Sequence, residues 1–243
     1  MGEQSIHVMY YTMRSMGDTK LSILIPAYNE EKTIVEILRR VAAADIRPFE
    51  KEVLVIDNNS SDATASLARA APSVRVLSEK SPGKGAALVR GLAKATGDLV
   101  LFQDADLEYD PADIKKLLSV IESGTADVVY GSRNLSPKTR RGALVPRVGV
   151  WFITKLMNAL YGLSLTDVWT CYKLFPREAA GDFIAGGFES ELLFTAALAR
   201  RGYRFAEVPI SYTPRKVSEG KKIRYRDGML AIGALVFDWL SHF

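Results

Sequence analysis

The chain is poor in the residues from which zinc sites and disulfides are built. Its 243 residues include one cysteine, Cys171, and two histidines, His7 and His242. A single cysteine cannot form an internal disulfide, and so few sulfur and nitrogen ligands argue against a zinc site. The cysteine content therefore gives no sign of an oxidising compartment.

Long apolar runs are also absent. No segment reaches the roughly 18 continuous apolar residues that cross a bilayer, and residues 1–20 lack the apolar centre of a secretion signal. Neither Gly-x-Gly-x-x-Gly nor a Walker A loop occurs, which disfavours dinucleotide and P-loop sites. We expect residues 1–20 to form a poorly ordered extension.

The composition is that of an ordinary globular protein, with 48% hydrophobic and 25% charged residues. The net charge is only +4, but the basic residues are unevenly placed. They gather in two groups: Lys138, Arg140, Arg141 and Arg147, and Arg215, Lys216, Lys221, Lys222, Arg224 and Arg226. Both groups adjoin apolar helical stretches, and no nucleic-acid-binding motif occurs, so we expect a membrane surface as partner and no nucleic acid.

Two carboxylates follow a short apolar run in the middle of the chain. Leu99–Phe102 predicts a buried strand, and Asp104 and Asp106 come directly after it. In extended backbone, residues i and i+2 point to the same side, so both carboxylates can face one point. Two close anions repel each other unless a cation lies between them, and a hard divalent cation that also touches a diphosphate suits that place. Asp110 and Pro111 then predict an N-cap and the first residue of a helix.

Strand and helix patterns alternate through the first half of the chain. We expect strands over residues 21–26, 53–57, 74–77, 99–102 and 128–131, and helices over 33–44, 63–70, 86–95 and 111–123. Asn29 is the expected N-cap of the first helix. This alternation predicts βαβ units and a mostly parallel α/β sheet flanked by helices.

Polar residues follow each of these five strands. Ligands bind at the carboxyl ends of the strands in such sheets, so we expect one binding site at this edge. The residues in question are Tyr28 and Glu30, Asp57, Lys84, Asp104 and Asp106, and Arg133. For a lone Asp-x-Asp motif, a plain acidic surface loop would be the better interpretation, but the other strand ends favour a site.

The alternation fades after Arg133. We expect an apolar, aromatic-rich helix over residues 148–165, a loop leading into a short strand at 166–173, a helix over 190–201, a strand over 205–212 and an apolar helix over 225–243. The first and last of these helices, with the basic residues beside them, could form an amphipathic platform on a membrane interface.

Several motifs resemble family 2 glycosyltransferases of the GT-A fold. They are Pro26-Ala-Tyr-Asn-Glu30, Asp57-Asn-Asn-Ser-Ser-Asp62, Gly83-Lys-Gly85 and Asp104-Ala-Asp-Leu-Glu108. A second set resembles the polyprenyl-phosphate sugar synthases, the dolichol-phosphate mannose and glucose synthase group. It comprises Gly131-Ser-Arg133, Asp167-x-x-Thr-Cys-Tyr-Lys173, Gly187-Phe-Glu189, and Val208-Pro209 followed by Arg215 and Glu219-Gly-Lys-Lys222. The resemblance covers residues 21–227 and implies a GT-A domain over 21–222 followed by a C-terminal apolar helix over 223–243.

The resemblance also implies roles for individual residues. Nucleotide-sugar binding is implied for Pro26, Tyr28, Glu30, Asp57, Lys84 and Asp104. Metal binding is implied for Asp104, Asp106 and Glu108, the last standing where mannose synthases usually have Gln. Catalytic roles are implied for Asp106, Arg133 and Arg215, and contact with the acceptor phosphate for Thr170, Lys221 and Lys222.

The implied reaction is the inverting transfer of mannose or glucose from GDP-mannose or UDP-glucose to a polyprenyl phosphate such as dolichyl or undecaprenyl phosphate, with Mg²⁺ or Mn²⁺. A phosphate acceptor is already an anion at pH 7 and needs cations to position it rather than a general base. Because the sequence has no membrane span, we expect the enzyme to lie peripherally on the cytoplasmic face of a membrane or to use a membrane-anchoring partner.

Two alternatives remain open. A family 2 enzyme acting on a hydroxyl acceptor, in polysaccharide or glycolipid synthesis, would need a carboxylate base, for which Glu189 and Glu191 are the candidates. A non-catalytic nucleotide-sugar-binding subunit would be expected to have lost Asp104 or Asp106, and both are present.

Overall fold

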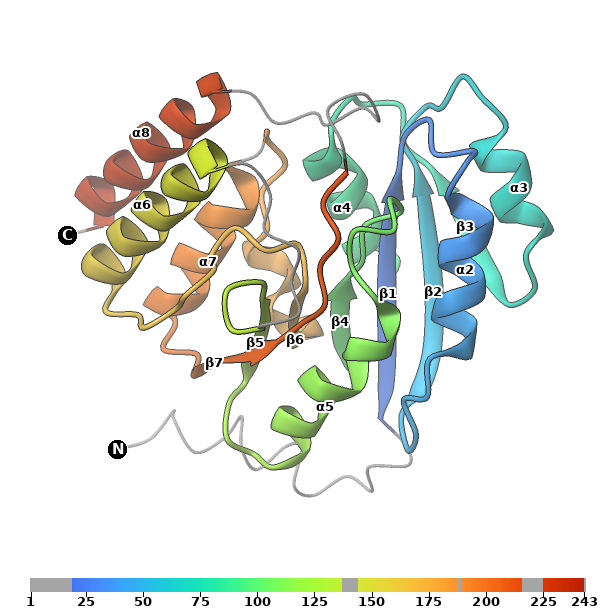
Figure 1. Ribbon diagram of the computed structural model, residues 1–243, viewed down its shortest axis with the longest axis horizontal. Coiled ribbons are helices and arrows are strands. Elements are labelled where there is room, and N and C mark those ends of the chain that lie inside the picture. The colour runs from blue at the N-terminus through green and yellow to red at the C-terminus, as the bar shows by residue number, and fades with distance from the viewer. Residues whose placement is uncertain (1–18, 137–143, 188, 216–224, 243) are drawn as a thin grey trace.

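The protein is built on a seven-stranded sheet flanked by helices (Figure 1). A computed structural model describes residues 19–136, 144–187, 189–215 and 225–242. The strands are β1 (Lys20–Ala27), β2 (Glu50–Asp57), β3 (Val74–Ser78), β4 (Leu99–Phe102), β5 (Val128–Ser132), β6 (Lys173–Pro176) and β7 (Phe205–Pro209). Their order across the sheet is β3-β2-β1-β4-β6-β5-β7.

The sheet is mostly parallel, as the alternation of strands and helices predicts. β1 pairs in parallel with β2 and β4, β2 with β3, and β5 with β7. The exception is β6, which runs antiparallel between β4 and β5. The beginning of β6 therefore lies at the same edge of the sheet as the carboxyl ends of its neighbours. The segment that precedes β6 reaches the ligand-binding edge for this reason.

The helices are α2 (Ile34–Ala43), α3 (Thr64–Ala70), α4 (Lys84–Leu92), α5 (Ile114–Glu122), α6 (Leu144–Tyr161), α7 (Ser190–Arg200) and α8 (Tyr225–His242). α2 and α5 each bury a stripe of apolar residues at the spacing i, i+3, i+4, i+7, which turns one helical face towards the core. In α2 these residues are Ile34, Ile37, Leu38 and Val41. α4 packs on β1 and β2 at Gly91, where a Cβ atom would lie 2.8 Å from the Ile56 side chain.

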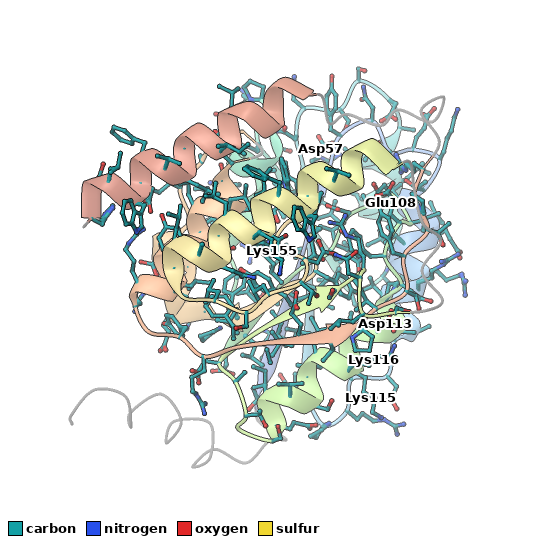
Figure 2. The ribbon with its side chains drawn as sticks, turned by 60° about the vertical axis from the view of Figure 1, so that its left-hand side comes forward. Asp57, Glu108, Asp113, Lys115, Lys116 and Lys155 are labelled. Atoms are coloured by element: carbon teal, nitrogen blue, oxygen red, sulfur yellow. The ribbon has the colours of Figure 1, made fainter. Side chains whose placement is uncertain are left out.

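Three helices form the C-terminal part of the protein. α6 and α8 lie side by side on the outside, and both contact α7 (Figures 1 and 2). Asp238 of α8 ties them together, because its carboxylate accepts hydrogen bonds from the Tyr161 hydroxyl of α6 (2.6 Å) and from Arg200 of α7. Across the described ranges, no helix has the length and apolar character required to cross a membrane.

The prediction that Asn29 caps the first helix is wrong. α2 begins at Ile34 after Thr33, and Asn29 instead adopts a left-handed backbone conformation with φ of 53°. Its Oδ1 atom accepts the backbone N–H of Ser61 at 2.9 Å. Asn29 thus joins the loops after β1 and β2 rather than starting a helix. By contrast, Asp110 caps the turn at Pro111–Asp113, where its Oδ1 accepts the Ala112 N–H at 3.1 Å, as predicted.

Candidate functional site

A cavity of about 630 Å³ opens at the carboxyl edge of the sheet. Its lining includes most of the residues predicted from the strand ends and motifs, brought together because parallel strands end at one edge. They are Pro26, Tyr28, Glu30, Lys84, Asp104, Asp106, Glu108, Arg133 and Arg215. The edge location predicted from the sequence is thus where the structure has its cavity.

The two carboxylates after β4 lie close enough to influence each other. Burial, and then the negative charges of Asp104 and Glu108, raise the pKa of Asp106 to about 7, and Arg215 offsets this only in part. Ionising Asp106 is therefore costly as long as no further cation reaches it. Asp104 and Asp106 are thus electrostatically coupled, although the backbone turns at Ala105 and Asp106 rather than continuing extended as predicted.

Glu108 is held by protein donors rather than pointing freely into the cavity. Its two carboxylate oxygens accept the Tyr212 hydroxyl (2.7 Å) and the Arg215 backbone N–H (2.6 Å). Leu107 has a left-handed φ of 63°, so the chain turns between Asp106 and Glu108 instead of continuing extended. Figure 2 places Glu108 beside the segment that follows β7. We call this segment, residues 210–215, the strap.

The strap lies against the loop that follows β4. Near its start, the buried carboxylate of Asp113 accepts the Ser211 backbone N–H at 2.6 Å. At its end, the Arg215 guanidinium reaches across to Glu30 after β1, with nitrogen–oxygen distances of 2.6 and 3.1 Å. Arg215 also donates to the Asp106 carbonyl at 3.0 Å. The strap thus carries a positive charge between the loops that follow β1 and β4.

Arg133 is engaged more fully than the sequence suggests. Its guanidinium forms a two-point ion pair with the buried Asp167, at 2.7 Å for both contacts, and donates to the Trp169 carbonyl at 3.0 Å. It also lies over the ring of Tyr212, 5.1 Å from its centre. Arg133 therefore holds the loop before β6 and the strap together while lining the cavity.

Lys84 links the acid pair to the interior. Its amine lies 2.8 Å from Asp104 Oδ1 and 2.9 Å from Glu191 Oε1. Burial disfavours the charged amine, but the neighbouring negative groups, Asp104 first, raise the pKa of Lys84 well above its usual value. Lys84 is thus a charged amine that lines the cavity and is paired with two carboxylates.

Glu191 also lines the cavity but is neutralised by two lysines. Its Oε1 atom contacts Lys84, and its Oε2 atom lies 3.1 Å from the amine of Lys173. Burial works against the carboxylate, but Lys84 and Lys173 overcome it and lower the pKa of Glu191 to about 2. Glu189 does not line the cavity, and its carboxylate accepts the Gly187 N–H at 2.8 Å. Paired with a lysine on each oxygen, Glu191 lacks the features of a general base near neutral pH.

Asp57 ends β2, is 6% exposed and does not line the cavity, although the next residue, Asn58, does. The Oδ1 atom of Asp57 has no hydrogen-bond partner in the described part of the chain. The next residue, Asn58, is fully used, because it accepts the Gly83 N–H at 2.8 Å and donates to the Ser81 carbonyl at 2.6 Å. Asn58 thus fixes the loop before α4, whereas Asp57 retains one buried acceptor atom without a partner among the described residues.

Thr170 is not at the cavity. It is fully buried, and its hydroxyl oxygen accepts the Tyr172 backbone N–H at 3.2 Å. It therefore supports the turn into β6 in this structure. Lys221 and Lys222, the other residues predicted to meet an acceptor phosphate, lie outside the described residues.

A profile of the family described as Glycosyl transferase family 2 matches residues 22–183, more than half of the chain. The chain belongs to glycosyltransferase family 2. Within the matched region lie all the cavity-lining carboxylates except Glu191.

Two relatives within family 2 extend the comparison. A hexosyltransferase of low-salt glycan biosynthesis from Haloferax volcanii is 32% identical over 205 residues, which are 81% of this chain but only 48% of that protein. The chain therefore spans about half the length of that relative. An uncharacterized glycosyltransferase from Mycobacterium tuberculosis is 31% identical over 210 residues, 85% of this chain and 91% of its own length.

The solved structures that resemble this one share the GT-A fold. Glucosyl-3-phosphoglycerate synthase from M. tuberculosis, crystallised with Mn²⁺, UDP and glucosyl-3-phosphoglycerate, superimposes with a TM-score of 0.71 at 24% identity, covering 90% of this chain and 80% of that one. The same protein has been crystallised with Mg²⁺ and UDP, at a TM-score of 0.70. At this identity the likeness establishes the fold of the family 2 domain.

A divalent cation fits the carboxylates of this family 2 chain. Asp104 and Asp106 supply the hard oxygen ligands that Mg²⁺ and Mn²⁺ prefer. Burial first, and then the negative charges of Asp104 and Glu108, raise the pKa of Asp106, and a bound cation would offset both effects. Within the described ranges, no three His, Cys, Asp or Glu side chains form a group that could hold a metal ion. Mg²⁺ commonly uses one or two carboxylates together with substrate phosphates, so Asp104 and Asp106 are the residues that would hold it.

The sequence missed several residues that line this family 2 cavity, among them Asn58, Tyr109, Trp169 and Tyr212. Trp169 lies in the loop before the antiparallel β6, and Tyr212 lies in the strap. The rule that ligands bind at the carboxyl ends of parallel strands covers neither segment. Tyr109 stacks on Tyr172 with ring centres 5.3 Å apart. Asn58 could have been predicted from the sequence, because it follows Asp57 in the Asp57–Asp62 motif that resembles family 2.

Proposed function

We propose that the chain is an inverting hexosyltransferase that moves mannose or glucose from a nucleotide-diphosphate sugar to a polyprenyl phosphate. The observation that carries the acceptor class is the state of Glu191. The one carboxylate predicted as a base that lines the cavity is held between two lysines, with a pKa of about 2. A hydroxyl acceptor needs a base to remove its proton, whereas a phosphate acceptor is already an anion.

The donor would lie along the ends of β1, β2 and β4. Asp57 precedes the cavity-lining Asn58, and its buried, unpartnered Oδ1 would accept an N–H of the base once the donor is bound. Tyr28 and Glu30 line the cavity itself. These contacts suit GDP-mannose and UDP-glucose alike, since both bases present N–H donors. The diphosphate would lie between Asp104, Asp106 and the guanidinium of Arg215.

The chemistry is a single displacement. An oxygen of the acceptor phosphate attacks the anomeric carbon, a new carbon–oxygen bond forms, and the bond to the nucleotide diphosphate breaks on the opposite face. The electron pair leaves with the diphosphate, whose growing charge Arg215 and Lys84 would help to neutralise. A Mg²⁺ or Mn²⁺ ion held by Asp104 and Asp106 would supply further charge neutralisation at the leaving group. No proton has to be removed, so no step requires Glu191 as a base.

A lipid acceptor agrees with the surface of α6 and α8. The large apolar side chains exposed there are Val148, Trp151, Phe152, Leu230, Val236, Phe237 and Leu240. Figure 2 shows the two helices side by side across one face of the protein. The basic groups of the sequence adjoin both helices, which favours an anionic membrane surface. We propose that the enzyme acts peripherally at the cytoplasmic face of a membrane, with or without an anchoring partner.

The proposal is tested with purified protein, Mg²⁺ or Mn²⁺, a short-chain polyprenyl phosphate and a panel of labelled nucleotide sugars, followed by lipid extraction. We expect label in the organic phase with one donor, inversion at the anomeric carbon, and no label with Asp106→Ala. If a nucleotide sugar binds but no donor labels the lipid, the phosphate acceptor is wrong and a glycan or other hydroxyl acceptor takes its place. A protein that binds nucleotide sugars and transfers to no acceptor would be a binding subunit.

A further inference from the structure

Lys173 is a fully buried lysine that has no part in the transfer described above. It begins β6, has no exposed surface and does not line the cavity. Its amine donates to the Thr170 carbonyl, contacts Glu191 Oε2 at 3.1 Å and lies 5.0 Å from the centre of the Tyr130 ring. A buried ammonium is costly unless it is paired and hydrogen-bonded, and here each side of the amine has a partner.

From Lys173 a line of alternating charges runs out to the cavity. Glu191 bridges Lys173 and Lys84, with one carboxylate oxygen on each amine. Lys84 then contacts Asp104 Oδ1 at 2.8 Å and Cys171 Sγ at 3.1 Å. The members of the line are Lys173, Glu191, Lys84 and Asp104.

Stability alone is a weak explanation for such a line. A buried ion pair recovers its desolvation cost only with very good geometry, and apolar residues of similar volume are often as stabilising. The line of charges fixes the position of the flexible Lys84 side chain. Lys84 has a four-carbon stem, and carboxylates on two sides of its amine restrict where that amine can lie.

We propose that Lys173 and Glu191 are positioning residues that hold Lys84 against Asp104 and thereby fix the first carboxylate of the Asp-x-Asp pair. The inference rests on the proposed function for its activity readout, but its metal-binding readout does not. Without Lys173, the Glu191 carboxylate has only the Lys84 amine as a cationic partner. The Lys84 amine is then attracted more strongly to Glu191 and moves away from Asp104. Asp104 then loses its fixed partner.

A double-mutant cycle tests this inference. The variants are Lys173→Met, Lys84→Met and the combination, each measured for transfer and for Mn²⁺ affinity in the presence of the nucleoside diphosphate, by electron paramagnetic resonance. We expect Lys173→Met to lower kcat about tenfold and Mn²⁺ affinity several-fold, with KM for the nucleotide sugar within about twofold, as for a misplaced catalytic group. In the Lys84→Met background, Lys173→Met should have no further effect on either quantity, because its influence passes through Lys84.

Two further variants separate positioning from folding. Lys173→Arg keeps the charge and should restore most of the kcat and Mn²⁺ affinity. Glu191→Gln keeps the shape but removes the bridging charge, and should match Lys173→Met even if that variant folds poorly. Lys51→Met is the matched control, because Lys51 donates to the Val41 and Ala44 carbonyls at 2.7 and 2.8 Å, away from the cavity. It should lower thermal stability and leave kcat and Mn²⁺ affinity unchanged.

Additive effects of Lys173→Met and Lys84→Met would overturn the inference. So would a Lys173→Met or Glu191→Gln protein that melts at a lower temperature but keeps wild-type kcat and Mn²⁺ affinity. If the wild type transfers no sugar to any acceptor, the proposed function fails, and the Mn²⁺ cycle alone still decides the positioning role.

Discussion

Two regions of the protein, the charged cavity and the outer face of α6 and α8, are organised in different ways. On the side of β1, β2 and β4, charged groups face one another across short loops, as in the pairs Glu30–Arg215 and Lys84–Asp104. On the side of α6 and α8, large apolar side chains such as Trp151 and Phe237 are more than half exposed. The first side suits a small, highly charged ligand, and the second suits an apolar surface. Mutations in the charged cavity should therefore affect sugar transfer and Mn²⁺ binding, whereas mutations on α6 and α8 should affect action at liposomes.

The largest effect should come from the acid pair. Asp106→Ala should reduce transfer by about a thousandfold or more and abolish Mn²⁺ binding, because it removes a ligand and a charge at the leaving group. Binding to liposomes should be unchanged. Asp45→Ala, an acid outside the cavity, is the control and should leave transfer at wild-type level. Near-normal transfer by Asp106→Ala would remove the acid pair from the mechanism.

Arg215→Met should have the next largest effect. The variant loses the two-point contact with Glu30 and the donor to the Asp106 carbonyl, and we expect kcat/KM for the nucleotide sugar to fall about a hundredfold, in line with charge stabilisation of a leaving group. Arg215→Lys should be intermediate, since an ammonium cannot make the two-point contact. Equal kcat/KM in all three proteins would show that the strap does not meet the donor.

Replacing exposed apolar residues of α6 and α8 should separate membrane contact from catalysis in the cavity. The double variant Trp151→Ser and Phe237→Ser should lose about tenfold in transfer to a long-chain acceptor in anionic liposomes. Full burial of a large apolar side chain contributes about 2 kcal/mol, and a membrane interface buries each of these side chains only in part. Transfer to a short-chain, water-soluble acceptor should be unchanged. Flotation with liposomes should weaken as salt rises.

Val35→Ser is the control for that experiment, because Val35 is exposed on α2, away from the C-terminal helices. Equal losses with both acceptors would mean that the α6 and α8 face supports the fold rather than a membrane contact.

The smallest effect should come from Glu108→Gln. Because both Glu108 oxygens accept protein donors, we expect Mn²⁺ affinity to stay within about threefold and kcat to fall about threefold, as one charge-assisted hydrogen bond to the strap is weakened. A drop of tenfold or more in Mn²⁺ affinity, measured by electron paramagnetic resonance, would instead support the role of metal ligand that the resemblance implied.

The sequence predicts the parallel part of the fold and the edge where the cavity lies. Apolar runs such as Leu99–Phe102 are short, bounded and fully buried in the structure, so periodicity and turn residues suffice to find them. The same rule brings Glu30, Asp104 and Asp106 to one place before any coordinates are known.

The other parts of the fold and of the cavity depend on contacts between residues far apart in the sequence, which local sequence patterns do not encode. The antiparallel direction of β6 brings Trp169 and Cys171 to the cavity, and the strap brings Tyr212, whereas the sequence assigned roles in those segments to Thr170 and Arg215 instead. The left-handed backbone at Asn29 and Leu107 likewise redirects side chains that local rules expect elsewhere. Such positions are set by tertiary contacts across the site.

The central claim is that the acceptor is an anion that attacks without a general base. It is tested most directly by comparing transfer to a polyprenyl phosphate with transfer to the polyprenol of the same chain length, using one donor, one metal and the same vesicles. We expect sugar on the phosphate and none on the alcohol. Glu191→Gln should lose phosphate transfer only to the extent expected from the misplacement of Lys84. Comparable transfer to the alcohol, abolished in Glu191→Gln, would contradict the claim and make Glu191 a base for a hydroxyl acceptor.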